Sequence, residues 1–166
     1  MKNFFILLIP GLLILFQSCG DNDNRKSFAN VVEYNDFIID RVNEVDRQYA
    51  DVLNNSKDQA EGIIACDSLL VLTNRTLERL ENLQAFREDC TFCVAAKGFV
   101  NYMKVISTRE LPQFFGLIFN LNRSQEDQSE IDRRADYLDR RYEAEMAHLN
   151  LVQKALSTKF NFQINH

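Results

Sequence analysis

Residues that interrupt regular structure are scarce in most of this chain. After Gly20 the sequence contains one proline, Pro112, and only three glycines, at positions 62, 98 and 116. Because turns depend heavily on these two residue types, their scarcity predicts a few long helices rather than many short strands. The ring of Pro112 removes one backbone hydrogen bond, so the helix that contains it is expected to be kinked or split there.

Apolar side chains recur at steps of three and four residues along four segments. This period places them on one face of an α-helix, and several such faces bury one another in a bundle. Short connections make neighbouring helices antiparallel, so the prediction is an all-α, up-down-up-down four-helix bundle. The stripes consist of Val31, Ile38, Val42, Val45, Tyr49 and Val52; Ile63, Leu70, Leu77 and Leu80; Phe92, Ala96, Phe99, Met103 and Ile106; and Ala135, Leu138, Tyr142, Leu149, Val152 and Leu156.

Capping residues mark where the last three helices should begin. The second helix is expected to open with a capping box at Ser56. Asp89 is the expected cap of the third helix, in a connection without glycine or proline. Ser124 precedes Glu126 and Asp127, which together fit the start of the fourth helix.

The first residues have the pattern of a secretory signal. Lys2 is followed by an apolar run over residues 4–16, which is too short for a membrane span, and Ser18 supplies a small residue before Cys19. A cysteine at this position resembles the lipobox of bacterial lipoproteins, in which the thiol is diacylated and becomes the new N-terminus. The alternative is an ordinary cleaved signal peptide with a coincidental cysteine.

The sequence therefore divides into three parts. Residues 1–18 are the predicted signal peptide, residues 19–27 are the lipidated cysteine with its flexible acidic tether, and residues 28–166 are the bundle. Two acyl chains would hold such a protein on a bilayer essentially permanently. The acidic residues after Cys19 also resemble the surface-export signal of Bacteroidota lipoproteins. This implies a lipid-anchored protein of the cell envelope, at the outer membrane and exposed on the surface.

The charge of the mature part argues against nucleic acid as a partner. Without Lys2, the 19 basic residues of the chain become 18, against 24 acidic residues, which gives a net charge of −6. A domain with this balance has no overall electrostatic attraction for nucleic acid or for anionic lipid headgroups. The expected contacts are the membrane, through the lipid anchor, and a protein partner.

Cys90 and Cys93 form a C-x-x-C motif at the expected start of the third helix, where a helix N-terminus stabilises a thiolate. Thioredoxin-type motifs lie between a strand and a helix, and a four-thiolate zinc site needs a second such pair. A local disulfide, or two thiols packed at the bundle end, is therefore preferred to a redox centre. Cys66 lies about 27 Å or more from Cys90 along the rod and is expected to be a free, buried thiol.

Glu145 and His148 form the second motif with chemical meaning. Glu-x-x-His on a bundle helix is half of a di-iron signature. Because the only other histidine is His166, the second half is missing, and a mononuclear metal or cofactor site is what remains of this hypothesis. The preferred alternative is a boundary glutamate bonded to a tyrosine or an arginine, with His148 near the surface.

The aromatic residues around Pro112 are candidates for a partner surface. Phe114, Phe115 and Phe119 cannot all face one core from a single helix, so some of them could form an exposed apolar patch. The preferred alternative is that the fourth helix and the tail at residues 160–162 cover them.

Two short segments carry a resemblance to known proteins. Tyr34–Ile38 and the closing Lys159–Phe162 are similar to segments of uncharacterised four-helix lipoproteins of Bacteroidota and spirochaetes. The resemblance implies the fold and the location but no reaction. The sequence also has no nucleophile–base pair, phosphate loop or nucleotide fingerprint. We therefore expect a non-catalytic binding or structural module without a cofactor, with a thiol-redox protein or a metal-binding bundle as alternatives.

Overall fold

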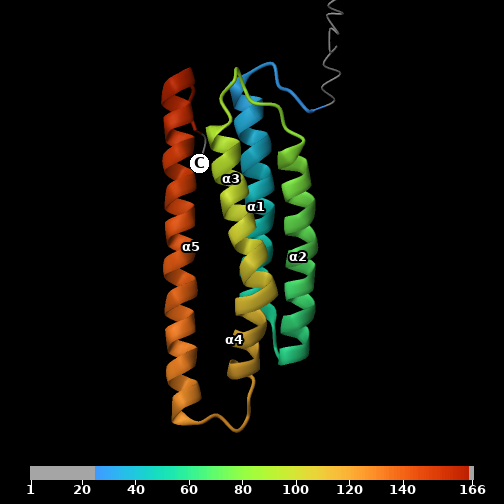
Figure 1. Ribbon diagram of the computed structural model, residues 1–166, viewed down its shortest axis with the longest axis vertical. Coiled ribbons are helices and arrows are strands. Elements are labelled where there is room, and N and C mark those ends of the chain that lie inside the picture. The colour runs from blue at the N-terminus through green and yellow to red at the C-terminus, as the bar shows by residue number, and fades with distance from the viewer. Residues whose placement is uncertain (1–24, 165–166) are drawn as a thin grey trace, which may run out of the picture.

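Five α-helices and one π-helical turn form the part of the chain that the computed structural model describes, residues 25–164 (Figure 1). This part contains no β-strand, and its four helical rods pack against one another, so the predicted all-α fold is confirmed. The predicted signal peptide and Cys19 lie outside the described residues. In chain order the elements are α1 (Val31–Asn55), α2 (Gln59–Glu81), α3 (Thr91–Val105), the π-helical turn η1 (Ile106–Glu110), α4 (Leu111–Ile118) and α5 (Gln125–Phe160).

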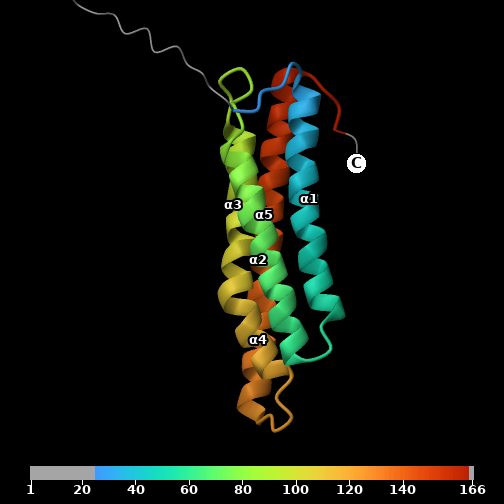
Figure 2. The same cartoon turned by 90° about the vertical axis from the view of Figure 1, so that its right-hand side faces the viewer.

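The rods share one long axis, and α3, η1 and α4 follow one another end to end (Figures 1 and 2). These three segments together are called the third rod below, and it contacts α1, α2 and α5. Residues 25–30, the α2–α3 loop and the end of α5 lie at one end of the molecule, at the top of Figure 1, which we call the upper end. The α1–α2 and α4–α5 connections lie toward the other end.

A π-helical turn separates α3 from α4. Within it, Ser107 and Thr108 each donate a hydroxyl hydrogen bond to the backbone carbonyl of Lys104, at 2.9 and 3.0 Å. Pro112 follows in the first turn of α4, where a missing backbone N–H is tolerated. The widened turn therefore lies directly before the residue that cannot continue the hydrogen-bond ladder.

The helix caps agree with the sequence at one of three positions. At α3 the prediction of Asp89 is wrong by one residue, because Cys90 occupies the cap position. At α5, the Ser124 hydroxyl accepts from the backbone N–H of Asp127 and the Asp127 carboxylate accepts from that of Ser124, which confirms Ser124 as the predicted cap and forms a capping box. The prediction of Ser56 as the cap of α2 is wrong, because Asp58 occupies that position. A carboxylate interacts more favourably than a hydroxyl with the positive end of the helix dipole. Ser56 instead closes α1 by donating to a backbone carbonyl in its last turn.

The predicted apolar stripes agree with the core in α1 and α3 but only in part in α2 and α5. In α2, Ile63 is 40 % exposed, so its assignment to the core is wrong. In α5, Ala135 is exposed and Ile131 is buried one turn earlier. The hydrophobic pattern misleads in α2 because small and hydroxyl-bearing residues fill much of the buried face. These buried residues are Gly62, Cys66, Leu69, Thr73, Thr76, Leu77 and Leu80.

Polar side chains join α1 to α5. The buried amides of Gln153 and Asn35 are hydrogen-bonded at 2.9 Å, with the Gln153 side chain as the donor. The Tyr142 hydroxyl donates to the carboxylate of Asp46 at 2.8 Å, and its ring stacks on Tyr49 with 5.6 Å between the centroids. These contacts fix how α5 sits along α1, because a shift of one turn would leave buried polar groups unpaired.

The small residues of α2 allow the third rod to approach closely at Gly62. A Cβ atom at this position would lie 2.6 Å from Cδ2 of Phe115, whose side chain is almost completely buried. That distance is shorter than any ordinary carbon–carbon contact. The absence of a side chain at Gly62 is therefore a requirement of the packing between α2 and α4.

Replacing Gly62 by alanine is expected to destabilise the protein although alanine is the better helix former. The propensity gain is about 1 kcal/mol, whereas pressing a methyl group against the buried ring costs about 1–3 kcal/mol. Gly98→Ala is the matched control, because nothing lies within 4 Å of the added atom, and it should raise the free energy of unfolding by about 0.5–1 kcal/mol. Urea unfolding followed by circular dichroism measures both, and similar shifts in the two variants would contradict the close contact.

Candidate functional site

The N-terminal segment is hydrogen-bonded to the loop between α2 and α3. The backbone N–H of Lys26 donates to the carbonyl of Asn82 at 2.8 Å, and the N–H of Gln84 donates to the carbonyl of Lys26 at 2.9 Å. Phe28 packs its ring against Phe37 and Tyr34 of α1, with centroids 5.4 and 6.2 Å apart. The chain that leads back toward position 19 is therefore attached to the upper end of the bundle.

The same loop contains a strained two-residue turn. Phe86 and Asp89 exchange two backbone hydrogen bonds, and the residues between them, Arg87 and Glu88, have φ angles of 47° and 69°. Such left-handed positions favour glycine and cost other residues about 1 kcal/mol or more each. The Phe86 ring offsets part of this cost, because it is buried between Tyr34 and an aromatic ring at the end of α5.

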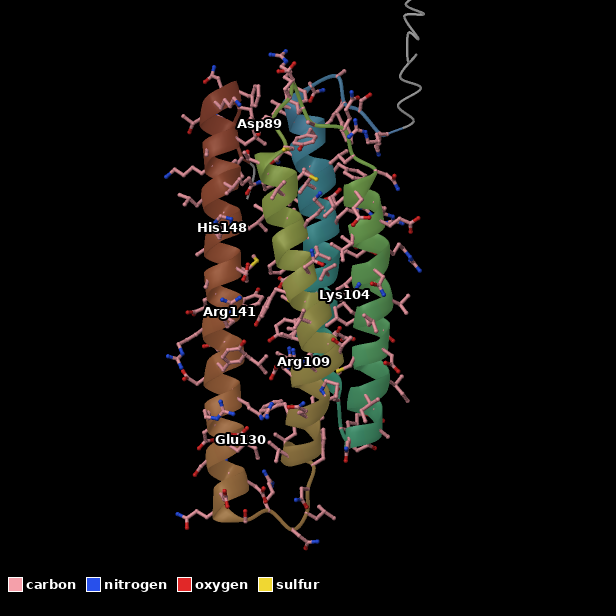
Figure 3. The ribbon with its side chains drawn as sticks, in the orientation of Figure 1. Asp89, Lys104, Arg109, Glu130, Arg141 and His148 are labelled. Atoms are coloured by element: carbon pink, nitrogen blue, oxygen red, sulfur yellow. The ribbon has the colours of Figure 1, made fainter. Side chains whose placement is uncertain are left out.

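Asp89 joins the turn to the start of α3 and to the end of α5 (Figure 3). Its Oδ1 atom accepts hydrogen bonds from the backbone N–H and the hydroxyl of Thr91, at 2.9 and 2.6 Å, from the position directly before the cap residue Cys90. Its Oδ2 atom accepts from Nζ of Lys159 at 2.5 Å. The hydrogen bonds from Lys159 and Thr91 lower the pKa of the carboxyl group to about 2.

The two thiols of the C-x-x-C motif have different environments. Cys90 is exposed, whereas Cys93 is buried and its Sγ atom donates to the backbone carbonyl of Leu80 at 3.3 Å. Burial raises the pKa of Cys93, which is the opposite of what an attacking thiol needs. Both sulfurs are free in the structure, and a disulfide between them stays a prediction for an oxidising compartment.

Cys66 is a free and buried thiol in α2, as predicted. Burial raises its pKa to about 11, so the thiol is protonated at neutral pH and packs as a small apolar side chain.

Glu145 and His148 do not converge on a common point. Glu145 is half-buried and accepts a hydrogen bond from Arg141 at 2.9 Å, whereas His148 is exposed on α5 (Figure 3). This arrangement agrees with the boundary glutamate that the sequence favours. Within residues 25–164, no three histidine, cysteine, aspartate or glutamate side chains gather as metal ligands.

The aromatic residues at α4 are covered fully at Phe115 and in part at Phe114 and Phe119, but not by the tail. Phe115 is buried against α2, and Phe114 and Phe119 are half-buried around it. The expectation that the tail covers them is wrong, because Phe160 packs on Phe86 at the upper end while α4 lies near the opposite end (Figure 1). The length of α5 is the reason, since its 36 residues carry the tail past the whole third rod.

A basic pocket that the sequence did not suggest lies between α1 and α2 near the upper end. It has a volume of about 490 Å³. Its charged residues come from three elements that are far apart in the sequence, so no local spacing predicts them. The one available signal is the pair Arg75 and Arg79, since like charges four residues apart repel on a helix unless an anion lies nearby. The lining residues are Lys26, Phe37, Arg41, Arg75, Glu78, Arg79 and Asn82.

Comparison of the chain with protein-family models, with curated proteins and with solved structures gave no match. The interpretation of the upper end and of the basic pocket therefore depends on their geometry. No helix within residues 25–164 combines the length and the apolar character needed to cross a membrane.

The ion pair of Asp89 should make the stability of the protein depend on pH in the acid range. Because the folded pKa of about 2 lies below the ordinary value of 3.8, the pair stabilises the fold above about pH 4 and this contribution is lost as the pH falls toward 2. Asp89→Asn should lower the free energy of unfolding at neutral pH by about 1–2 kcal/mol and flatten the pH dependence. Asp136, which forms an exposed ion pair with Arg140, supplies the control. Asp136→Asn should change the free energy of unfolding little. Unfolding curves at several pH values measure both variants, and parallel profiles for Asp89→Asn and wild type would exclude this role.

The thiols should differ in their rates of alkylation. Cys90 is expected to react with iodoacetamide in the folded protein, whereas Cys66 and Cys93 should react only after unfolding, because both are buried with raised pKa values. Mass spectrometry of peptides from timed reactions measures this order, and Cys90→Ser should remove only the fast modification. Fast alkylation of Cys93, or reduction of a disulfide substrate that depends on it, would instead support the redox alternative.

Proposed function

We propose that this protein is a lipoprotein of the bacterial cell envelope, anchored through a diacylated Cys19, and that its helical bundle is a non-catalytic binding or structural module. The observation that carries the proposal is the apolar run over residues 4–16 that ends at Ser18-Cys19 and is followed by a polar segment. The resemblance of Tyr34–Ile38 and Lys159–Phe162 to segments of four-helix lipoproteins of Bacteroidota and spirochaetes supports an outer-membrane, surface-exposed location.

The attachment of the N-terminal segment supports this arrangement. Lys26 is hydrogen-bonded to Asn82 and Gln84 at the upper end. A lipid at Cys19, seven residues earlier, would therefore hold the bundle by that end. Seven residues span at most about 25 Å, so the upper end would stay close to the bilayer.

An up-down-up-down course with a third rod divided near Pro112 is part of the same proposal. It is supported by helix connections that alternate between the two ends in Figures 1 and 2 and by the turn at η1. In a bundle of this kind the two termini lie at the same end. A lipid anchor and a C-terminal tail would then share the face toward the membrane.

The partners of the reactive side chains favour a binding role over catalysis. Cys93 is bonded to a backbone carbonyl, Glu145 to an arginine and Asp89 to a lysine and a threonine. Each of these groups already has a structural partner. A metal-dependent activity would need Glu145 to be free of its arginine. Redox exchange with the exposed Cys90 would need Cys93 as a thiolate, which the raised pKa of the buried Cys93 opposes.

The lipid anchor can be tested by metabolic labelling. Cells that express the full chain and are fed an alkyne-tagged fatty acid should yield a labelled protein in the membrane fraction, and Cys19→Ser should abolish the label. Cys90→Ser is the matched control, because it removes an exposed thiol from the folded domain and should keep the label. Label that persists in Cys19→Ser, or a wild-type protein without label, would reject the anchor.

A further inference from the structure

The basic pocket between α1 and α2 concentrates positive charge in a protein whose net charge is −5. Four cationic side chains line it and one carboxylate, Glu78, lies among them. A second carboxylate, Glu44, contacts two of these cations. The four positive and two negative charges leave an excess of +2 around one cavity. The four cations are Lys26, Arg41, Arg75 and Arg79.

Two of the four cations lie on one aromatic ring. Nζ of Lys26 lies 4.0 Å and Cζ of Arg41 lies 5.5 Å from the centroid of Phe37. The ring attracts each cation but cannot cancel the repulsion between them. An anion in the pocket would relieve that repulsion, and the ring would offer an apolar wall to the group that carries the anion.

Glu44 holds two of the guanidinium groups in place. Its Oε2 atom accepts a hydrogen bond from Nη1 of Arg41 at 3.2 Å and lies 3.9 Å from Nη1 of Arg79 on the neighbouring helix. The carboxylate therefore bridges α1 and α2 beside two of the pocket's cations. Guanidinium groups that are held before binding lose less conformational freedom when an anion arrives.

Donors of the pocket remain available for a ligand. Within residues 25–164, no ion pair holds Arg75, which lines the same cavity. The Arg75 side chain is exposed, so its guanidinium donors are open to an anion in the cavity.

We propose that the basic pocket binds a phosphate monoester. A phosphate monoester carries a charge close to −2 at neutral pH, which balances the excess of +2, whereas a single carboxylate would balance only half of it. Its oxygens accept hydrogen bonds in several directions, as donors on α1, on α2 and on the N-terminal segment require. The Phe37 ring would contact the organic part of the ester.

This proposal deepens the binding role proposed above and depends on it, but it does not depend on the lipid anchor. Lys26 is a member of the pocket and lies seven residues after Cys19. A phosphate at the bilayer surface is therefore one source of the ligand, and a soluble phosphate ester is the other. Both sources present the same terminal phosphate group to the pocket.

The proposal is tested on the full-length protein extracted from its membranes in mild detergent. Titration with glycerol 3-phosphate, followed by calorimetry, should show saturable binding by the wild type. Arg75→Gln combined with Arg79→Gln should weaken it by about tenfold or more, as expected for lost charge-assisted hydrogen bonds. Arg123→Gln is the matched control, because Arg123 is exposed in the α4–α5 connection, and it should leave the affinity within about twofold.

Further readouts separate a specific site from a change in charge or in folding. Circular dichroism should show that the double variant remains folded, since Arg75 is exposed and the Arg79 side chain is 40 % exposed. Binding should also weaken below about pH 6, where the phosphate loses its second charge. An absence of glycerol 3-phosphate binding, or an equal loss in Arg123→Gln, would overturn the proposal.

The source of the phosphate is decided by competition in the same detergent solution. Phosphatidic acid that displaces glycerol 3-phosphate, where phosphatidylcholine does not, would identify a lipid headgroup as the ligand. Phosphatidic acid that fails to displace it would identify a soluble ester, and both outcomes retain the phosphate site. Binding that is normal in a protein without fatty-acid label would reject the anchor alone, and labelled protein without binding would reject the pocket alone.

Discussion

The structure depends on the burial of the third rod, which contacts each of the other three. Phe92, Phe99 and Met103 have no exposed surface, and Ile106 is almost as completely buried. A helix that is apolar over so much of its surface can exist only when neighbours surround it. The close approach of α2 at Gly62 covers this rod on one side, and the long α5 covers it on another. The π-helical turn η1 joins α3 to α4, so the rod extends past Pro112.

Polar contacts then select one arrangement of the helices around that core. The pairs Gln153–Asn35, Tyr142–Asp46 and Lys159–Asp89 each join α5 to a segment at least 70 residues earlier in the chain. Apolar packing alone tolerates small shifts along a helix, whereas a shifted hydrogen bond leaves a buried polar group unpaired. These contacts therefore define the register of α5 and bring its last turn to the upper end.

The upper end combines the features that bear on function. It holds the N-terminal segment, the strained turn at Arg87 and Glu88, the Asp89–Lys159 pair and, on its side, the basic pocket. The anchor proposed at Cys19 and the proposed anion site are physically compatible, because both would lie toward the upper end. The overall acidity of the protein does not oppose this, since the charge that a ligand meets is set within a Debye length of about 8–10 Å.

The helical class, the number of rods, the cap at Ser124 and the free buried thiol at Cys66 could all be predicted from the amino-acid sequence. These features follow from the helical period of the apolar residues, from the scarcity of proline and glycine, and from the spacing of the capping residues. Each of these signals acts over a few residues of the chain. Helix packing, in contrast, sets Gly62 rather than Ile63 toward the core and places the tail far from α4. It also brings Lys26, Arg41 and Arg75 to one pocket. Such contacts join segments that are far apart in the chain. They depend on how far each helix is shifted along its neighbours, and side-chain packing sets that shift rather than any local sequence pattern.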